Sequence, residues 1–172
     1  AQDLRQAFDL MPTATVEDWS TISTRLKALP GAIDGYIATL REGIARGVVP
    51  ARRQVVEVAT QIGRYTADTG FFAEFVGEAA PDEGQLPASL ARDLDQNAGA
   101  ARVAYDSLAS FLSSELAPVA GETDGVGREL YALHSRQFLG ATIDLDETYE
   151  WGVEELARMV AEQESIANEI LP

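Results

Sequence analysis

The sequence predicts an all-α protein of six to seven helices packed as antiparallel hairpins. Apolar residues recur at spacings of three and four along most of the 172-residue chain, which is the spacing of one helix face. Alanine occurs 27 times and arginine 12 times, and both residues have high helix propensity. Strand signals are nearly absent. We therefore expect a single helical domain over residues 1–172, forming a helical bundle.

The expected helices follow one another from the first residues onward. Short helical segments are expected at residues 1–10 and 70–76, and longer helices at 16–29, 32–45, 51–66, 88–116, 125–138 and 145–170. Residues 77–87 hold two prolines, glycines and acidic residues, a composition typical of an exposed loop.

Capping and breaking residues set the N-terminal boundaries. Pro12 ends the first segment, and Thr15 caps the next helix with Asp18 in a capping-box arrangement. Pro30 is expected to begin a further helix, because proline fits the first turn of a helix better than its interior. Gly47 is expected to end that helix in the C′ position.

Apolar stripes support the central helices. The stripe of helix 51–66 consists of Val55, Val58, Ala59, Ile62 and Tyr65. Segment 70–76 carries Phe71, Phe72 and Phe75, which we expect in the core or on an edge that packs against another domain. The longest helix has a stripe of Leu90, Leu94, Ala98, Ala101, Tyr105, Leu108, Leu112 and Leu116. Each stripe predicts one buried helix face.

Two helices complete the predicted fold. Helix 125–138 places Leu130, Leu133, His134 and Phe138 on or near one face. Asp144 starts the last helix, and Glu147 completes an Asp-x-x-Glu cap. Val153, Leu156, Val160 and Ile166 of that helix are expected to lie inward.

Composition excludes several functional classes. The chain has no cysteine, which excludes disulfide scaffolds, cysteine-based zinc sites and thiol catalysis. Its one histidine, His134, excludes a zinc site built from several histidines of this chain. A formal net charge of −15 argues against binding nucleic acid. No apolar run approaches the length of a membrane span, and no signal peptide is visible, so we expect a cytoplasmic protein that does not bind membranes.

The acidic string from Asp144 to Glu150 is the first candidate site. Asp146 and Glu150 lie four residues apart and would share one helix face, as a carboxylate metal site requires. The favoured alternative is helix capping, because acids at a helix N-terminus stabilise its free N–H groups. A metal site would need a second acidic helix opposite this string.

Other candidates have equally plain structural alternatives. His134 is a candidate proton donor or substrate contact, since an imidazole titrates near neutral pH, although a lone helical histidine is more often structural. The arginines at positions 41, 46, 52 and 53 are candidates for binding a carboxylate or phosphate. In so acidic a chain, intramolecular ion pairs are the favoured interpretation. A carboxylate-bridged metal bundle needs Glu-x-x-His motifs, and Tyr131 stands where that motif would place glutamate before His134.

An ordered set of sequence strings resembles a known family. The strings are Asp9-Leu-Met-Pro12, Trp19, Arg25-Leu26, Leu40-Arg-Glu-Gly-Ile44, Val49-Pro-Ala-Arg-Arg-Gln54 and Phe138-Leu-Gly-Ala-Thr-Ile-Asp-Leu-Asp-Glu-Thr-Tyr-Glu-Trp-Gly152. Together they resemble the N-terminal half of the bacterial family catalogued as domain of unknown function 885, over essentially all 172 residues.

The resemblance implies a large helical protein of the zinc metallopeptidase type, with a His-Glu-x-x-His helix in its C-terminal half. That motif is absent here, so no zinc ligand or general base is carried over to this chain. The resemblance implies that the chain is an N-terminal piece, catalytically inactive alone, with zinc bound by the missing part. By analogy with helical metallopeptidases, it would form one wall of a substrate channel. The channel candidates are Tyr149, Trp151, Asp146, Glu150 and His134.

The partners expected from this interpretation are the C-terminal half of the same protein, or a dimer mate that covers an apolar face left bare. A peptide is the expected substrate. The alternative hypothesis is a stand-alone helical module that binds a partner protein and has no catalytic activity. An exposed apolar face would favour the first hypothesis.

Overall fold

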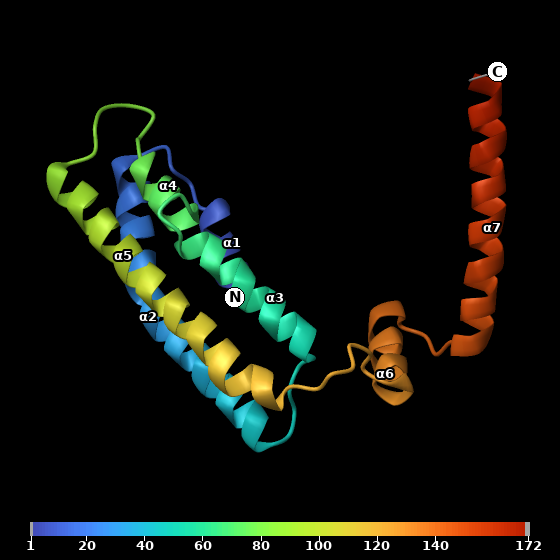
Figure 1. The fold of residues 1–172 in the computed structure, drawn as a ribbon. Helices are drawn as coiled ribbons and strands as arrows, with labels where there is room; N and C mark the ends of the chain where they lie inside the picture. Colours follow the sequence, from blue (N-terminus) through green and yellow to red (C-terminus); the bar gives the residue numbers. More distant parts are fainter. Residues whose placement is uncertain (1, 171–172) are drawn as a thin grey trace. The chain divides into compact units, whose positions relative to one another are not determined.

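The computed structural model describes residues 2–170 of the chain, which divides into two compact units. Unit 1 spans Ala1–Asp124 and unit 2 spans Gly125–Pro172. Both units are helical, and residues 2–170 contain no β-strand (Figure 1). The predicted all-α fold is therefore confirmed. The expectation of one domain over residues 1–172 stays a prediction, and each unit is described by itself.

The helix boundaries lie within a few residues of the expected ones in most places. Unit 1 contains α1 (Gln2–Asp9), α2 (Val16–Ala45), α3 (Arg52–Thr66), α4 (Phe71–Gly77), α5 (Ala88–Phe111), a π-helical turn (Leu112–Leu116) and a 3-10 turn (Ala117–Val119). Unit 2 contains α6 (Arg128–Leu139) and α7 (Leu145–Ile170). Residues 78–87 form the predicted loop without regular secondary structure.

Both ends of α2 are formed by the capping signals in the sequence. The Thr15 hydroxyl accepts a hydrogen bond from the backbone N–H of Asp18 at 3.1 Å, and the Asp18 carboxylate accepts one from the backbone N–H of Thr15 at 2.8 Å. At the other end, Gly47 has φ +70°, and the N–H of Val48 donates to the carbonyl of Gly43 at 2.9 Å. This is the Schellman arrangement, which needs glycine at the left-handed position.

The prediction that Pro30 begins a new helix is wrong. α2 is one helix of 30 residues with Pro30 inside it. An interior proline has no N–H to donate and costs about 3 kcal/mol. Leu26, Leu29 and Ile33 on both sides of Pro30 are buried, and each such side chain contributes about 1.5–3 kcal/mol. Their combined burial outweighs the cost of the proline and keeps the helix continuous.

α5 is the central helix of unit 1 and contacts α2, α3 and α4 (Figure 1). α2 and α5 run parallel: the Asn97 side chain donates to the Ser23 hydroxyl at 2.9 Å. Further along α2, Arg41 contacts Glu115 of the π-helical turn that follows α5, at 2.7 Å. In each pair the two residues are 74 positions apart, which is the signature of parallel helices in constant register.

α3 runs antiparallel to α5. Near its start, Arg52 Nε donates to the carbonyl of Ala117 at 3.0 Å; at its end, the carbonyl of Thr66 accepts from Arg102 Nε at 2.8 Å. The backbone N–H of Arg52 also donates to the carbonyl of Gly121 at 2.7 Å. α3 is thus hydrogen-bonded at its start to the residues that follow α5, and at its end to α5 itself.

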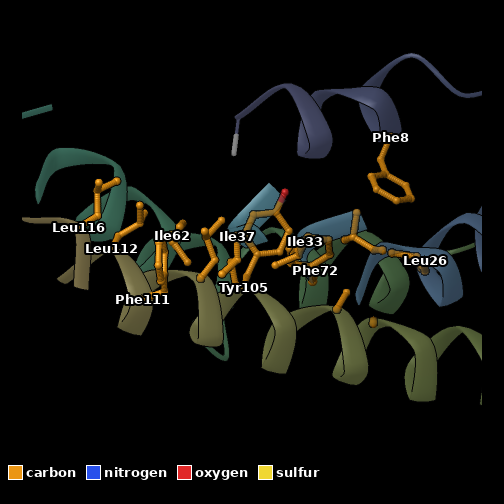
Figure 2. Close-up of a cluster of buried hydrophobic side chains, with 14 of the residues drawn as sticks. Phe8, Leu26, Ile33, Ile37, Ile62, Phe72, Tyr105, Phe111, Leu112 and Leu116 are labelled. Atoms are coloured by element: carbon orange, nitrogen blue, oxygen red, sulfur yellow. The ribbon is translucent and has the colours of Figure 1, made fainter. Parts of the chain in front are cut away.

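The core of unit 1 gathers apolar side chains from all five of its α-helices (Figure 2). Tyr105 of α5 is fully buried at its centre, with its ring 5.2 Å from that of Phe72 and 6.3 Å from that of Tyr65. Burial raises the pKa of the Tyr105 hydroxyl above its usual value. The guanidinium of Arg5 covers the ring of Phe71 at 4.6 Å. Of the three phenylalanines of segment 70–76, Phe72 is buried in the core, and Phe71 and Phe75 are half-buried and pack against it.

Unit 2 has no comparable core. None of its described residues, 125–170, is buried. The expectation that the apolar residues of the last helix lie inward is wrong for this unit: Val153, Leu156, Val160 and Ile166 are exposed. Two helices of this length provide too little apolar surface to enclose a side chain on all sides.

Among residues 2–170, no helix combines the length and apolar character needed to cross a bilayer.

Candidate functional site

The acidic string begins with the predicted helix cap. Oδ1 of Asp144 accepts hydrogen bonds from the backbone N–H groups of Asp146 at 2.9 Å and Glu147 at 3.0 Å. These bonds satisfy two of the free N–H groups at the start of α7. The capping interpretation of Asp144 is therefore confirmed.

Asp146 forms an ion pair with α6. Both of its carboxylate oxygens accept from Arg128, at 2.9 and 2.6 Å, in the bidentate geometry that suits guanidinium and carboxylate. The hydrogen bonds from Arg128, and then its charge, hold the pKa of Asp146 below its ordinary value. This carboxylate is committed to a contact within unit 2.

An open hollow of 610 Å³ lies within unit 2, beside the first three turns of α7. It is lined by Tyr131 of α6, Ile143 of the connecting segment, and Leu145, Thr148, Tyr149, Gly152, Val153 and Leu156 of α7. The lining is apolar apart from hydroxyl groups. Such a surface, with a few polar groups, is typical of a site for a small molecule or an extended peptide.

The structure separates the five channel candidates. Tyr149 lines the hollow, whereas Asp146, Glu150, Trp151 and His134 are not among its lining residues. At about 100° per residue, Trp151 lies on the opposite side of α7 from Tyr149 and Leu156. His134 is exposed on α6. Of the five candidates, Tyr149 alone is among the residues that line this hollow.

Three residues of this region carry no sequence signal for a site. Tyr131 and Ile143 line the hollow, and Arg128 pairs with Asp146. No local pattern marks them, because each acts through a residue on another element: Arg128 through Asp146, 18 positions away, and Tyr131 through the first turns of α7.

The described residues do not fit a zinc ion. Residues 2–170 hold no group of three or more His, Cys, Asp or Glu side chains arranged to hold a metal. The chain's single histidine is exposed, and Asp146 is paired with Arg128. Zinc sites in proteins use three or four such ligands. No catalytic step through a metal is assigned to this chain.

The candidate arginines form intramolecular ion pairs. Arg41 pairs with Glu115, Arg46 with Glu42, Arg52 with Glu122 and Arg53 with Asp124, at N–O distances of 2.6–2.7 Å. The hydrogen bonds from Arg41 lower the pKa of Glu115. The favoured interpretation, ion pairs with the chain's own acids, is confirmed. These pairs are exposed, so each contributes little to stability.

Replacing Arg128 with alanine is expected to raise the pKa of Asp146 to the range of an exposed aspartate. The native pair stabilises the fold above the ordinary aspartate pKa, and this contribution is lost as the pH falls through the lowered pKa of Asp146. A carbon-detected NMR titration of the Asp146 carboxyl measures the change. The matched control, Arg136→Ala in the same helix, should leave the pKa of Asp146 low. An unchanged Asp146 pKa in Arg128→Ala would show that the pair does not form.

Comparison with protein families assigns the whole chain. The sequence model of a family described as "Bacterial protein of unknown function (DUF885)" matches residues 1–172. A search of curated proteins finds no match. The match extends over both units and includes the hollow, the α7 cap and the central helix of unit 1. The chain therefore belongs to the DUF885 family of bacterial proteins.

Proposed function

We propose that this chain is the N-terminal, non-catalytic helical part of a zinc-dependent, peptidase-like hydrolase, and that unit 2 forms one wall of its substrate channel. The hollow beside α7 carries the proposal. It offers two tyrosine rings, Tyr131 and Tyr149, on an apolar floor where an extended peptide can lie. The cytoplasmic location expected from the sequence is part of the same proposal.

The division of labour follows from the chemistry of the side chains. A zinc ion would activate a water molecule for attack on a peptide carbonyl. Because the ligands for such an ion are missing from the described residues, the zinc and the general base belong to the C-terminal half of the proposed protein. The role of this chain is to bind and orient the peptide through Tyr131, Tyr149 and the aliphatic residues between them.

The decisive experiment uses the longer gene product. Zinc content by mass spectrometry and cleavage of a peptide library should both be positive for the full protein, and cleavage should be absent for residues 1–172 alone. A full-length protein without zinc in its His-Glu-x-x-His region would overturn the enzymatic proposal.

A pair of variants then tests the channel wall. In the full protein, Tyr149→Ala should raise KM with little change in kcat, because it removes a substrate contact remote from the zinc. Trp151→Ala removes a larger ring from the other side of α7 and should leave KM unchanged. Equal effects of the two substitutions would contradict the assignment of the wall to the hollow.

A second candidate function is a helical interaction module without catalysis. The exposed apolar residues of α7, which the first proposal assigns to contact with the catalytic half, would in this case bind a separate protein. This candidate expects neither zinc nor peptide cleavage from the longer gene product, so the same experiment separates the two functions.

A further inference from the structure

A continuous apolar surface runs along one face of α7. Its members, here called the α7 stripe, are Leu145, Tyr149, Val153, Leu156, Met159, Val160, Ile166 and Ile170. From Tyr149 onward these side chains are 43–74% exposed. The helix has 26 residues and is therefore roughly 39 Å long. Four of the eight members line the hollow, and the other four, Met159, Val160, Ile166 and Ile170, lie beyond the proposed substrate site.

The spacing of the α7 stripe matches a heptad repeat. Leu145, Gly152, Met159 and Ile166 are seven residues apart, and so are Tyr149, Leu156, Gln163 and Ile170. Six of these eight positions belong to the α7 stripe, and the other two hold Gly152 and Gln163. Alternation of these two series by four and three residues is the pattern of a helix that packs side by side with another helix. The shape of the surface therefore selects an α-helix as its occupant.

Acidic residues line both edges of the α7 stripe. Glu155, Glu162 and Glu169 follow one edge, and Asp146, Glu150 and Glu164 follow the other. α7 contains eight acidic residues and one basic residue, which leaves a formal charge of −7. Arg158, the basic residue, already contacts Glu155 at 2.6 Å and Glu162 at 2.9 Å. Asp146 is likewise paired with Arg128 of α6, so two arginines partly offset three of these six acids, and the edges keep a net negative charge.

We propose that the α7 stripe is the docking surface for a basic amphipathic helix. Such a helix places apolar residues at the two core positions of its heptad against the stripe, and lysine or arginine on both flanks against the acidic edges. The inference rests on the proposed function only in assigning this helix to the catalytic half of the hydrolase. The same apolar and charged contacts would bind a basic amphipathic helix from another protein.

Charge also excludes a second copy of α7 as the occupant. Two α7 stripes packed face to face would align acidic edge with acidic edge, and like charges across an interface are unfavourable. The formal charge of −15 on each chain adds to this repulsion. We therefore expect that residues 1–172 form no dimer through their α7 helices at physiological salt, and sedimentation velocity measures this.

The test uses residues 1–172 and designed peptide probes of about four heptads. One probe has leucine at both core positions and lysine on both flanks, and the other has glutamate in place of each lysine. Fluorescence anisotropy should detect binding of the lysine probe and none of the glutamate probe. Binding should weaken as salt rises, because salt screens the flanking charges.

Two matched variants separate docking from simple charge attraction. Leu156→Glu places a charge in the α7 stripe, and Ala161→Glu places the same charge on the opposite side of the helix. Simple attraction would make both variants bind the lysine probe more tightly. Docking predicts that Leu156→Glu weakens binding about tenfold or more and that Ala161→Glu does not weaken it. Circular dichroism of both variants checks that α7 stays helical.

A charge-reversed variant, Glu155→Lys with Glu162→Lys and Glu169→Lys, should weaken binding of the lysine probe and strengthen binding of the glutamate probe. Equal affinity for both probes, unchanged binding by Leu156→Glu, or a dimer broken by Leu156→Glu would overturn the proposal. Neither zinc nor cleavage enters these measurements, so the docking surface and the hydrolase can fail independently.

Discussion

Replacing Phe72 with alanine is expected to lower the free energy of unfolding of unit 1 by about 3–5 kcal/mol. Phe72 is fully buried on α4, and its ring lies 5.2 Å from Tyr105 and 6.4 Å from Phe8. The ring of Phe71 lies 5.2 Å away on the other side. Because these neighbours belong to three helices, they cannot close the cavity without moving the helices themselves. The cost should therefore lie toward the upper end of the range.

The measurement needs a signal from unit 1 alone. Trp19 is buried in unit 1 with its ring 5.4 Å from that of Phe75, whereas Trp151 belongs to unit 2. In a Trp151→Phe background, urea unfolding followed by tryptophan fluorescence reports on unit 1. The matched control is Phe138→Ala, which removes the same ring from a side chain that is 90% exposed and should change stability by less than about 0.5 kcal/mol. Equal effects would show that Phe72 is not part of a packed core.

The sequence predicts those parts of the fold that depend on neighbouring residues. The capping box at Thr15, the left-handed Gly47 and the cap at Asp144 each form through contacts within a few positions. The stripe of α5 is also visible in the sequence, because a regular spacing of apolar residues needs only one helix to reveal it. From Leu94 to Leu116 its members are buried as predicted.

Pro30 shows where the local rule fails. Proline alone indicates a helix start, although the apolar spacing of Leu26, Leu29 and Ile33 continues across it at three and four residues. The spacing does not state how much free energy the burial of these side chains contributes, and that contribution decides against the break. The parallel register of α2 and α5 depends in the same way on contacts across 74 residues.

In the candidate site, too, the features that depend on neighbouring residues could be predicted, and those that depend on contacts between helices could not. The capping role of the acidic string is local and could be predicted. The pairing of Asp146 with Arg128 could not, because it joins two helices. Helix geometry alone places Tyr149 and Trp151 on different sides of α7, so their grouping in one channel wall could have been tested from the sequence.

Replacing Gly70 with alanine is expected to destabilise unit 1 by about 1–3 kcal/mol, through crowding rather than through loss of a contact. Gly70 is buried where α3 turns into α4. A Cβ atom there would lie 2.4 Å from the carbonyl oxygen of Arg64 and 2.7 Å from that of Tyr65. Both atoms belong to the backbone of the last turn of α3, so no side-chain rotation relieves the clash.

The matched control is Gly63, which lies within α3. A Cβ atom at Gly63 meets nothing within 4 Å, so Gly63→Ala should stabilise unit 1 by about 0.5–1 kcal/mol, the gain expected from alanine in a helix interior. The same fluorescence titration compares the two variants. Changes of opposite sign in the free energy of unfolding would show that the close approach of the α3 backbone, and not helix propensity, requires glycine at position 70. Since α4 carries Phe72 into the core, a displacement of the segment between α3 and α4 should also disturb the contact of Phe72 with the ring of Tyr105. The double variant Gly70→Ala with Phe72→Ala should then lose less free energy of unfolding than the two single variants lose together.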